Sequence, residues 1–210
     1  MGRPRGMRKI ISLFQRNYDT DRLVRNEVVP GAEWVIAGEG VATRKFDGTA
    51  CMVKEGKLYK RYDAKKGKTP PPGFQPCQDP DPVTGHWPGW VKVGWENNDK
   101  YYREALTSGD PTNVSLPDGT YELCGPKIQG NHEQFDTHRL IPHGIYTLPA
   151  CPRDFDGIKE YLKTYPLSTY PRNIEGIVWH HPDGRMVKIK AKDFGIKRQR
   201  PSIGSNEIRL

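Results

Sequence analysis

The stretch Lys45-Phe46-Asp47-Gly48 decides how this chain of 210 residues is organised. Strand-like residues precede it at Val41–Arg44 and follow it at Thr49–Lys54. Asp-Gly is a common turn pair, so the stretch predicts a tight connection between two strands. A lysine at a strand end, beside a carboxylate, is also a candidate nucleophile. By itself the motif is weak, because a lysine on a turn is ordinarily a solvated charge.

Five charged residues follow this lysine in strand-like contexts. In chain order they are Arg61, Glu122, Glu175, Lys188 and Lys190. Val187-Lys188-Ile189-Lys190 has a period of two, which places both lysines on one face of a strand and the apolar residues on the other. Two neighbouring ammonium groups repel unless an anion or water lies between them. We therefore expect the lysine face of this strand either to bind a phosphate or to lie at a solvent-exposed edge.

The ordered series resembles the covalent nucleotidyltransferases, the superfamily of ATP-dependent DNA and RNA ligases and mRNA capping enzymes. The strings that carry the resemblance are Lys45-Phe46-Asp47-Gly48, Lys60-Arg61-Tyr62-Asp63, Tyr121-Glu122-Leu123-Cys124-Gly125, Glu175-Gly176-Ile177-Val178-Trp179 and Met186-Val187-Lys188-Ile189-Lys190. The sequence is also similar to the compact RNA ligases typified by vertebrate RNA ligase 1, through Pro88-Gly89-Trp90-Val91, Leu140-Ile141-Pro142-His143-Gly144 and Ile174–His180. The resemblance runs from about Trp34 to about Pro201.

The pattern of short strands and few helices predicts an α+β fold. The resemblance implies a single nucleotidyltransferase (adenylation) domain over residues 1–210, with antiparallel sheets flanked by helices, ATP-grasp-like and without a C-terminal OB-fold. Within it, residues 1–17 are expected to form a basic N-terminal helix or arm. Residues 64–88 are expected to form a Pro-rich loop insertion.

Individual elements are predicted from local patterns. The expected helices are Met7–Gln15, Asp99–Leu106 and Asp154–Thr164, the last with Phe155, Ile158, Tyr161 and Leu162 on its inner face. Besides the two strands around the turn, the expected strands are Glu33–Ala37, Lys57–Tyr62, Trp90–Gly94, Thr120–Cys124, Gly144–Leu148, Glu175–His180 and Arg185–Lys190. Hairpins are expected at Glu55-Gly56 and Pro182-Asp183-Gly184, and no regular structure in Thr69–Pro88.

The resemblance implies a role for each charged residue, with ATP as co-substrate and Mg²⁺ or Mn²⁺ as metal. The catalytic residues that the resemblance implies are Lys45, Asp47, Lys188 and Lys190. Its nucleotide-binding residues are Lys45, Arg61, Glu122, Tyr146, Glu175, Lys188 and Lys190, with Tyr146 stacked on adenine or else in the core. Its metal ligands are Glu175, Glu122 and Asp47. Lys188, Lys190 and Arg61 are expected to lower the pKa of Lys45. Arg44 departs from the acid that many relatives have there, which leaves open how the base is recognised.

The net charge of +8 suits a polyphosphate or nucleic-acid partner. Two basic clusters stand near the nucleotide motifs, and they are either solvated faces or phosphate contacts. The residues predicted to bind RNA are Lys65, Lys66, Lys68, Lys197, Arg198 and Arg200.

The function implied is an ATP-dependent RNA ligase for RNA repair. It would seal RNA 5′-phosphate and 3′-OH ends through lysyl-AMP and 5′-adenylated RNA intermediates. The alternatives are an mRNA capping-type guanylyltransferase and a non-catalytic RNA-binding module of the same fold. Capping enzymes normally carry an oligonucleotide-binding domain after the Lys-x-Lys strand, and only twenty residues follow Lys190.

The four cysteines lack Cys-x-x-Cys spacing, which favours free thiols in a reducing compartment over a zinc site. We expect a cytoplasmic protein with no membrane segment and no obligate protein partner. The basic N-terminus also allows a transit peptide, but an amphipathic helix packed on the domain is favoured.

Overall fold

The computed structural model describes residues 7–165 and 174–198, and the fold is α+β with mostly antiparallel sheets and few helices. The larger sheet has six strands in the order β10-β9-β5-β6-β8-β7, which are Arg139–Pro142, Gly119–Cys124, Thr49–Lys54, Lys57–Ala64, Trp87–Lys92 and Gln75–Pro76. The smaller sheet has four strands in the order β1-β12-β11-β4, which are Ile11–Ser12, Met186–Lys190, Gly176–His180 and Val41–Lys45. A two-stranded ribbon pairs β2 (Phe14–Arg16) with β3 (Val24–Val28).

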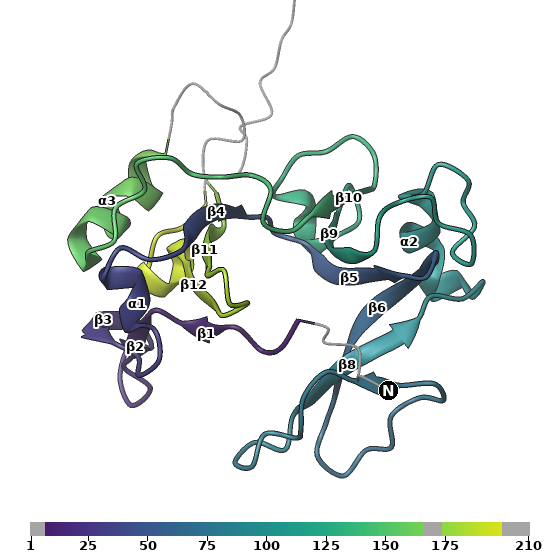
Figure 1. Cartoon of the computed structure of the whole chain (residues 1–210), viewed down its shortest axis with the longest axis horizontal. Helices are drawn as coiled ribbons and strands as arrows, with labels where there is room; N and C mark the ends of the chain where they lie inside the picture. Colours follow the sequence, from purple (N-terminus) through teal and green to yellow (C-terminus); the bar gives the residue numbers. More distant parts are fainter. Residues whose placement is uncertain (1–6, 166–173, 199–210) are drawn as a thin grey trace, which may run out of the picture.

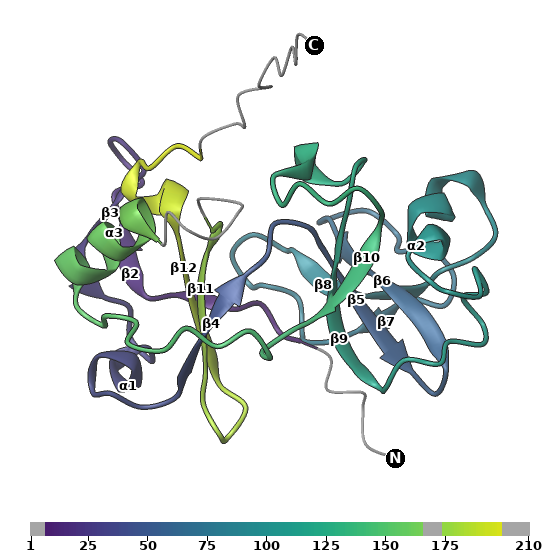
Figure 2. The same ribbon diagram turned by 90° about the horizontal axis from the view of Figure 1, so that it is seen from above.

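The helices are short and lie outside the sheets. They are α1 (Glu33–Ile36), α2 (Lys100–Glu104) and α3 (Phe155–Thr164), with 3₁₀ turns η1 (Asn97–Asp99), η2 (Gln129–Asn131) and η3 (Ala191–Phe194). Figure 1 and Figure 2 show the two sheets side by side, with α1 and α3 on the outer side of the smaller sheet and α2 on the far side of the larger one. The chain passes from one sheet to the other between β4 and β5, through residues 46–48.

Each sheet has its own hydrophobic core. Ile158 and Leu162 of α3 pack in one cluster with Ile177 and Ile189 of the smaller sheet, and Trp179 is fully buried there. A second cluster beneath the larger sheet joins strand residues to the region around α2, and it consists of Cys51, Val53, Leu58, Val93, Leu106, Val114, Tyr121 and Leu123. On each sheet, the face turned away from its main core is called the inner face, and that of the larger sheet carries a smaller cluster of Met52, Tyr59 and Trp90.

Most elements expected from the sequence are confirmed. The predicted helix at Asp154–Thr164 is α3, and Asp154 caps it by accepting a hydrogen bond from the backbone N–H of Gly157 at 2.8 Å. The predicted hairpin at Glu55-Gly56 joins β5 to β6, with φ of 51° and 67° at the two turn residues. The hairpin between β11 and β12 is confirmed as well.

The predicted helix at Met7–Gln15 is wrong. Ile11–Ser12 forms β1, parallel to β12, and Phe14–Arg16 forms β2. A helix would place Met7 and Phe14 on one face. Instead Met7 packs beside Met52 and Trp90 of the larger sheet, and Phe14 lies in the core of the smaller sheet. Pairing of Ile11–Ser12 with the edge of β12 thus overrides the helical spacing of the apolar residues in this segment.

Three further predictions need correction. The expected strand at Glu33–Ala37 is helix α1, because Trp34 and Val35 are both buried, whereas a strand would turn one of them outward. The expected strand at Gly144–Leu148 reduces to one β-bridge between Thr43 and Thr147, and β10 was not foreseen. The Pro-rich stretch Thr69–Pro88 does contain regular structure, since β7 pairs with β8 there.

The extent of a single domain over residues 1–210 stays a prediction, with which the fold is compatible. Across the described ranges, every helix falls short of the length and apolar character that crossing a bilayer demands.

Gly176 tests how tightly the smaller sheet is packed. A Cβ at this position would lie 2.1 Å from the carbonyl oxygen of Ile189. We expect Gly176→Ala to lower the free energy of unfolding by about 1–3 kcal/mol, as overpacking does. Gly119→Ala is the matched control, because its Cβ would meet its nearest atom at 3.9 Å. Urea denaturation measures both, and an equal effect of the two changes would refute the argument.

Candidate active site

Lys45 is the last residue of β4, at the junction of the two sheets. It stands opposite Gly176 of β11, which in turn stands opposite Lys190 of β12. The neighbours Val187 and Ile189 are fully buried in the core, while Lys188 and Lys190 are on the other face. The predicted division of this strand into an apolar and a cationic face is therefore confirmed.

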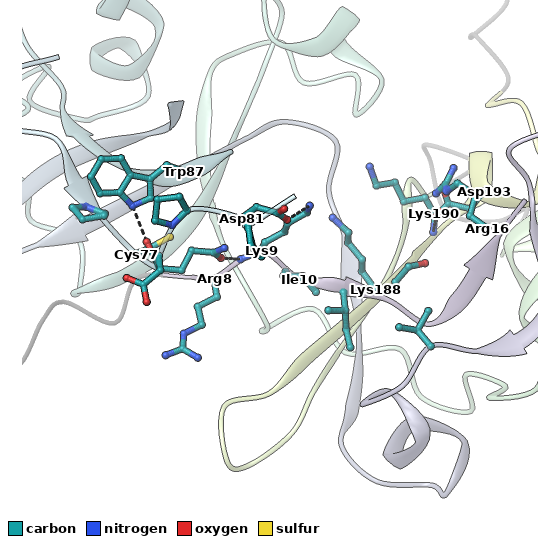
Figure 3. Close-up of a pocket in the computed structure, with 18 of the residues that line it drawn as sticks. Arg8, Lys9, Ile10, Arg16, Cys77, Asp81, Trp87, Lys188, Lys190 and Asp193 are labelled. Carbon is teal, nitrogen blue, oxygen red and sulfur yellow. Dashed lines mark hydrogen bonds and ion pairs between the residues drawn. The ribbon is translucent and has the colours of Figure 1, made fainter. Parts of the chain in front are cut away.

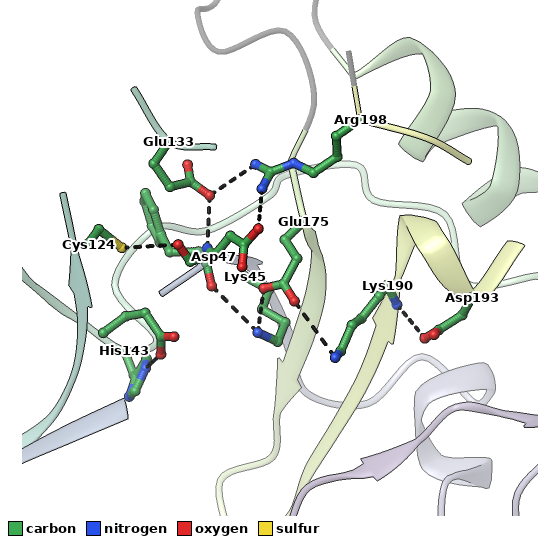
Figure 4. Close-up of polar contacts among 11 residues, drawn as sticks. Lys45, Asp47, Cys124, Glu133, His143, Glu175, Lys190, Asp193 and Arg198 are labelled. Carbon is green, nitrogen blue, oxygen red and sulfur yellow. Dashed lines mark hydrogen bonds and ion pairs between the residues drawn. The ribbon is translucent and has the colours of Figure 1, made fainter. Parts of the chain in front are cut away.

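Glu175 binds the candidate nucleophile directly. Its Oε2 accepts a hydrogen bond from Nζ of Lys45 at 2.5 Å, and its Oε1 lies 3.8 Å from Nζ of Lys190 (Figure 4). The absence of a side chain at Gly176 allows β11 and β12 to pack closely, and the carboxylate just before it contacts both lysines.

The pKa of Lys45 does not follow the expectation from sequence. Burial lowers this pKa, but the negative charges of Glu175, Glu122 and Asp47 outweigh burial and leave it above the ordinary value. The expected depression is wrong for this arrangement, because the sequence pattern counted the cations around Lys45 and not the three carboxylates. Burial raises the pKa of Glu175, against the opposing effect of Lys45.

Lys188 has the environment that was expected of Lys45. Burial, with the nearby charges of Lys190 and Lys45, lowers its pKa to about 8. Among the described residues, no carboxylate forms an ion pair with Lys188, since Glu175 is engaged by the other two lysines. An anion placed beside Lys188 would relieve this crowding of positive charge.

The chain leaves Lys45 through a close contact with β9. A Cβ at Gly48 would lie 2.2 Å from the carbonyl oxygen of Leu123, so only glycine fits there. This contact brings the connection against Glu122, whose Oε2 lies 2.8 Å from Nε2 of His143. The two sheets thus supply carboxylates from opposite sides, Glu175 from the smaller and Glu122 from the larger.

A buried carboxylate outside the predicted motifs, Glu133, holds the connection in shape. Its side chain is only 1% exposed and accepts hydrogen bonds from the Arg44 guanidinium at 2.6 Å and from the Asp47 backbone N–H at 2.9 Å. Arg198 completes the network, with 3.1 Å to Glu133 and 2.8 Å to Asp47. Residues on both sides of the nucleophile are therefore fixed by one group.

The loop that carries Glu133 has an unusual backbone. Gln129, Asn131 and Gln134 all have positive φ, between 47° and 58°. The Asn131 side chain bridges the loop by accepting from Phe135 N–H at 3.0 Å and donating to Phe135 C=O at 3.1 Å. Left-handed backbone at residues other than glycine is costly and is frequently found at functional sites.

Comparison with known proteins indicates one family of similar sequences. The family model described as RNA ligase 1 matches residues 111–206, which include β9, β11 and β12. The matched part of the chain is similar to the RNA ligase 1 family.

Proteins named RNA ligase 1 are similar to this chain in several vertebrates. The protein of Danio rerio is 27% identical over 140 residues, covering 54% of this chain and 42% of the relative. That of Rattus norvegicus is 27% identical over 232 residues (74% and 67%), and that of Pongo abelii is 29% identical over 147 residues (53% and 42%). The match therefore spans from under half to about two thirds of these relatives' length.

Arg61 and Tyr146 are two further predicted nucleotide contacts. The Arg61 guanidinium donates to the carbonyl oxygen of Met7 at 2.6 Å and lies over the Trp90 ring. Tyr146 is half exposed and meets the ring of Phe46 edge to face, with centroids 5.1 Å apart. The core location considered for Tyr146 is thus excluded, while its contact with adenine stays a prediction.

The predicted metal ligands do not form one cluster. No group of three His, Cys, Asp or Glu side chains within residues 7–165 and 174–198 is arranged to hold a metal ion. Glu175 faces Lys45, Glu122 faces His143, and Asp47 faces Arg198. Mg²⁺ is usually held by one or two carboxylates together with substrate phosphates, and Glu175 or Glu122 fits such a role.

The predicted RNA contacts are spread over the surface. Lys65, Lys66, Lys68 and Lys197 are exposed, whereas Arg198 is engaged with Asp47 and Glu133. Arg200 lies outside the described residues. Contact with RNA stays a prediction for all of them.

Two residues of the site were missed from sequence. His143 stands inside a string that carries the resemblance, and this was the available signal. Glu133 stands in a segment without strand or helix periodicity, and nothing local marks it.

The Glu133 network gives a test of stability. Glu133→Ala removes the acceptor for two arginines and one backbone N–H, so we expect a loss of about 3–5 kcal/mol in the free energy of unfolding. Asp136→Ala, an exposed carboxylate three residues on, should change it by less than about 0.5 kcal/mol. Urea denaturation of both variants decides the matter, and similar small losses would show that Glu133 does not hold the connection.

Proposed function

We propose that this protein is an ATP-dependent RNA ligase of the covalent nucleotidyltransferase type, with Lys45 as the nucleophile. The observation that carries the proposal is the grouping of Lys45, Glu175, Lys188 and Lys190 on the inner face of the smaller sheet. The relatives named RNA ligase 1 support RNA as the substrate. The two mostly antiparallel sheets of the fold are compatible with a single adenylation domain.

The first step requires Lys45 as a free amine. Glu175 accepts a hydrogen bond from the Lys45 ammonium at 2.5 Å, and burial raises the pKa of this carboxyl group, so Glu175 is the proposed proton acceptor. Nζ of Lys45 then forms a bond to the α-phosphorus of ATP. The bond from that phosphorus to the bridging oxygen breaks, and pyrophosphate leaves with the electron pair.

Lys188 and Lys190 stabilise the charge that develops on the α-phosphate. Both lysines project from one face of β12, on which Lys190 stands opposite Gly176, and Gly176 in turn stands opposite Lys45. Lys188 already lies in a surplus of positive charge. Mg²⁺ or Mn²⁺, held at Glu175 with Glu122 or Asp47, would supply further positive charge to the phosphates.

The later steps transfer AMP to RNA. An oxygen of the RNA 5′-phosphate attacks the lysyl-AMP phosphorus, and the bond from phosphorus to Nζ breaks. The RNA 3′-OH then attacks the 5′-phosphate, AMP leaves, and the hydroxyl proton is lost. Asp47 is the carboxylate proposed to act in this last step, near the incoming 3′-OH.

Replacement of Lys45 tests the first step. Lys45→Ala should form no adduct with radiolabelled ATP, because Lys45 is the proposed nucleophile. The same variant should still seal RNA that already carries a 5′-adenylate, since that step needs no lysine nucleophile. Lys163→Ala, an exposed lysine of α3, is the control and should form the adduct normally.

The choice of nucleotide separates the proposal from its alternatives. An adduct with ATP supports ligation, an adduct with GTP would indicate a capping-type guanylyltransferase, and no adduct with either would leave a non-catalytic RNA-binding module. Formation of lysyl-AMP by Lys45→Ala would overturn the assignment of the nucleophile.

Lys188 and Glu175 should be needed for adduct formation but not for the fold. We expect Lys188→Ala and Glu175→Ala each to slow it by about 10²–10³-fold, the loss typical of one transition-state contact. Lys192→Ala, an exposed lysine just beyond β12, is the control. Single-turnover rates with unchanged circular dichroism measure the effect, and wild-type rates in either variant would contradict these roles.

A further inference from the structure

A large pocket of about 1750 Å³ adjoins the lysine pair and reaches from one sheet to the other. Figure 3 shows Lys188 and Lys190 on one side of it, Cys77 and Trp87 on the other, and the segment Arg8–Ile10 between them. Pockets for small ligands usually measure about 300–1,000 Å³. This one exceeds the space that a single nucleotide needs.

The N-terminal segment forms the link across this pocket and is anchored at both ends. Leu13 N–H donates to Lys188 C=O at 2.8 Å, next to β12. At the other end, Lys9 N–H donates to the Gln78 side chain at 2.8 Å. Because backbone atoms make these anchors, the side chains of Arg8 and Lys9 are exposed on a fixed support.

The lining of the pocket is basic. Six cationic side chains face three carboxylates: Arg8, Lys9, Arg16, Arg22, Lys188 and Lys190 against Asp79, Asp81 and Asp193. Arg16 is neutralised by Asp193 at 2.6 Å, and Lys9 is only loosely paired with Asp81 at 3.9 Å. The lining therefore keeps an excess of positive charge, which favours the binding of a polyanion.

Two uncharged groups point to the same ligand. The Ser12 hydroxyl lines the pocket beside Lys188, its cross-strand neighbour, and is buried without a hydrogen-bond partner among the described residues. A phosphate oxygen at Lys188 would supply the missing partner. Tyr18 also lines the pocket and is 74% exposed, so its ring is accessible for stacking on a base.

We propose that this pocket binds a single strand of RNA that leads to the reactive end, with phosphates at Arg8, Lys9 and the Ser12–Lys188 pair and a base stacked on Tyr18. Cationic side chains along a groove with an exposed aromatic ring are the usual means of binding single strands. None of the lining residues is among those predicted from sequence to contact RNA. This inference rests on the proposed ligase function for the identity of the reacting end.

The test uses the full chain and a 5′-phosphorylated single-stranded RNA, with binding followed by fluorescence anisotropy across a salt series. Arg8→Gln with Lys9→Gln removes two phosphate contacts. At about 0.7 per contact, the salt slope should fall by about 1.4, and affinity at 0.1 M salt by about 25-fold. Lys159→Gln with Lys163→Gln removes the same charge from α3 and should leave both quantities nearly unchanged.

The ring of Tyr18 is tested separately. Tyr18→Ser should weaken RNA binding roughly fivefold or more, whereas Tyr18→Phe, which keeps the ring, should bind as the wild type does. Equal binding by Tyr18→Ser and wild type, or equal losses in the two double variants, would overturn the proposal.

Adduct formation with ATP alone distinguishes this inference from the proposed function. If the wild-type protein forms no adduct, the ligase proposal fails, and the RNA affinities still decide whether the pocket binds RNA. If the Arg8 and Lys9 changes raise the KM for ATP and leave RNA affinity intact, the pocket holds the nucleotide's phosphates and the inference is wrong.

Discussion

The hydrogen-bonded ion pair between Lys45 and Glu175 is the contact on which the site depends. Glu175 lies beside β4 because it directly precedes β11, which pairs with β4 so that Gly176 stands opposite Lys45. Gly176 also allows the backbones of β11 and β12 to pack closely. Gly48 then sets the path of that crossing against β9. Two glycines and one ion pair thus fix the position of the proposed nucleophile relative to both sheets.

The charges around Lys45 are balanced in a way that fits a phosphate substrate. Three carboxylates hold Lys45 protonated, while Lys188 lies in a surplus of positive charge that lowers its pKa. A polyphosphate entering beside Lys188 would satisfy that surplus. The pocket continues this basic surface toward Arg8 and Lys9, so the nucleotide and the RNA would enter one connected region.

Much of the fold could be predicted from sequence, because its hairpins and α3 rest on local signals. The Glu55-Gly56 turn, the Asp154 cap and the alternation around Lys188 each depend on residues close in the chain. The N-terminal segment could not be predicted, since it becomes a strand only by pairing with β12, far away in the chain. Likewise, α1 depends on the burial of Trp34 and Val35, and the segment 144–148 makes a single bridge to the distant Thr43.

The sequence by itself determined which side chains are available for chemistry: the Lys45 motif, the acids at 122 and 175, and the lysine pair on one strand face. Only the tertiary structure decided their state. It showed that Glu175 holds Lys45, that Lys188 rather than Lys45 has the lowered pKa, and that Glu133 supports the connection. The physical reason is that a pKa depends on every charge and on the burial around a group, and these come from segments far apart in the chain.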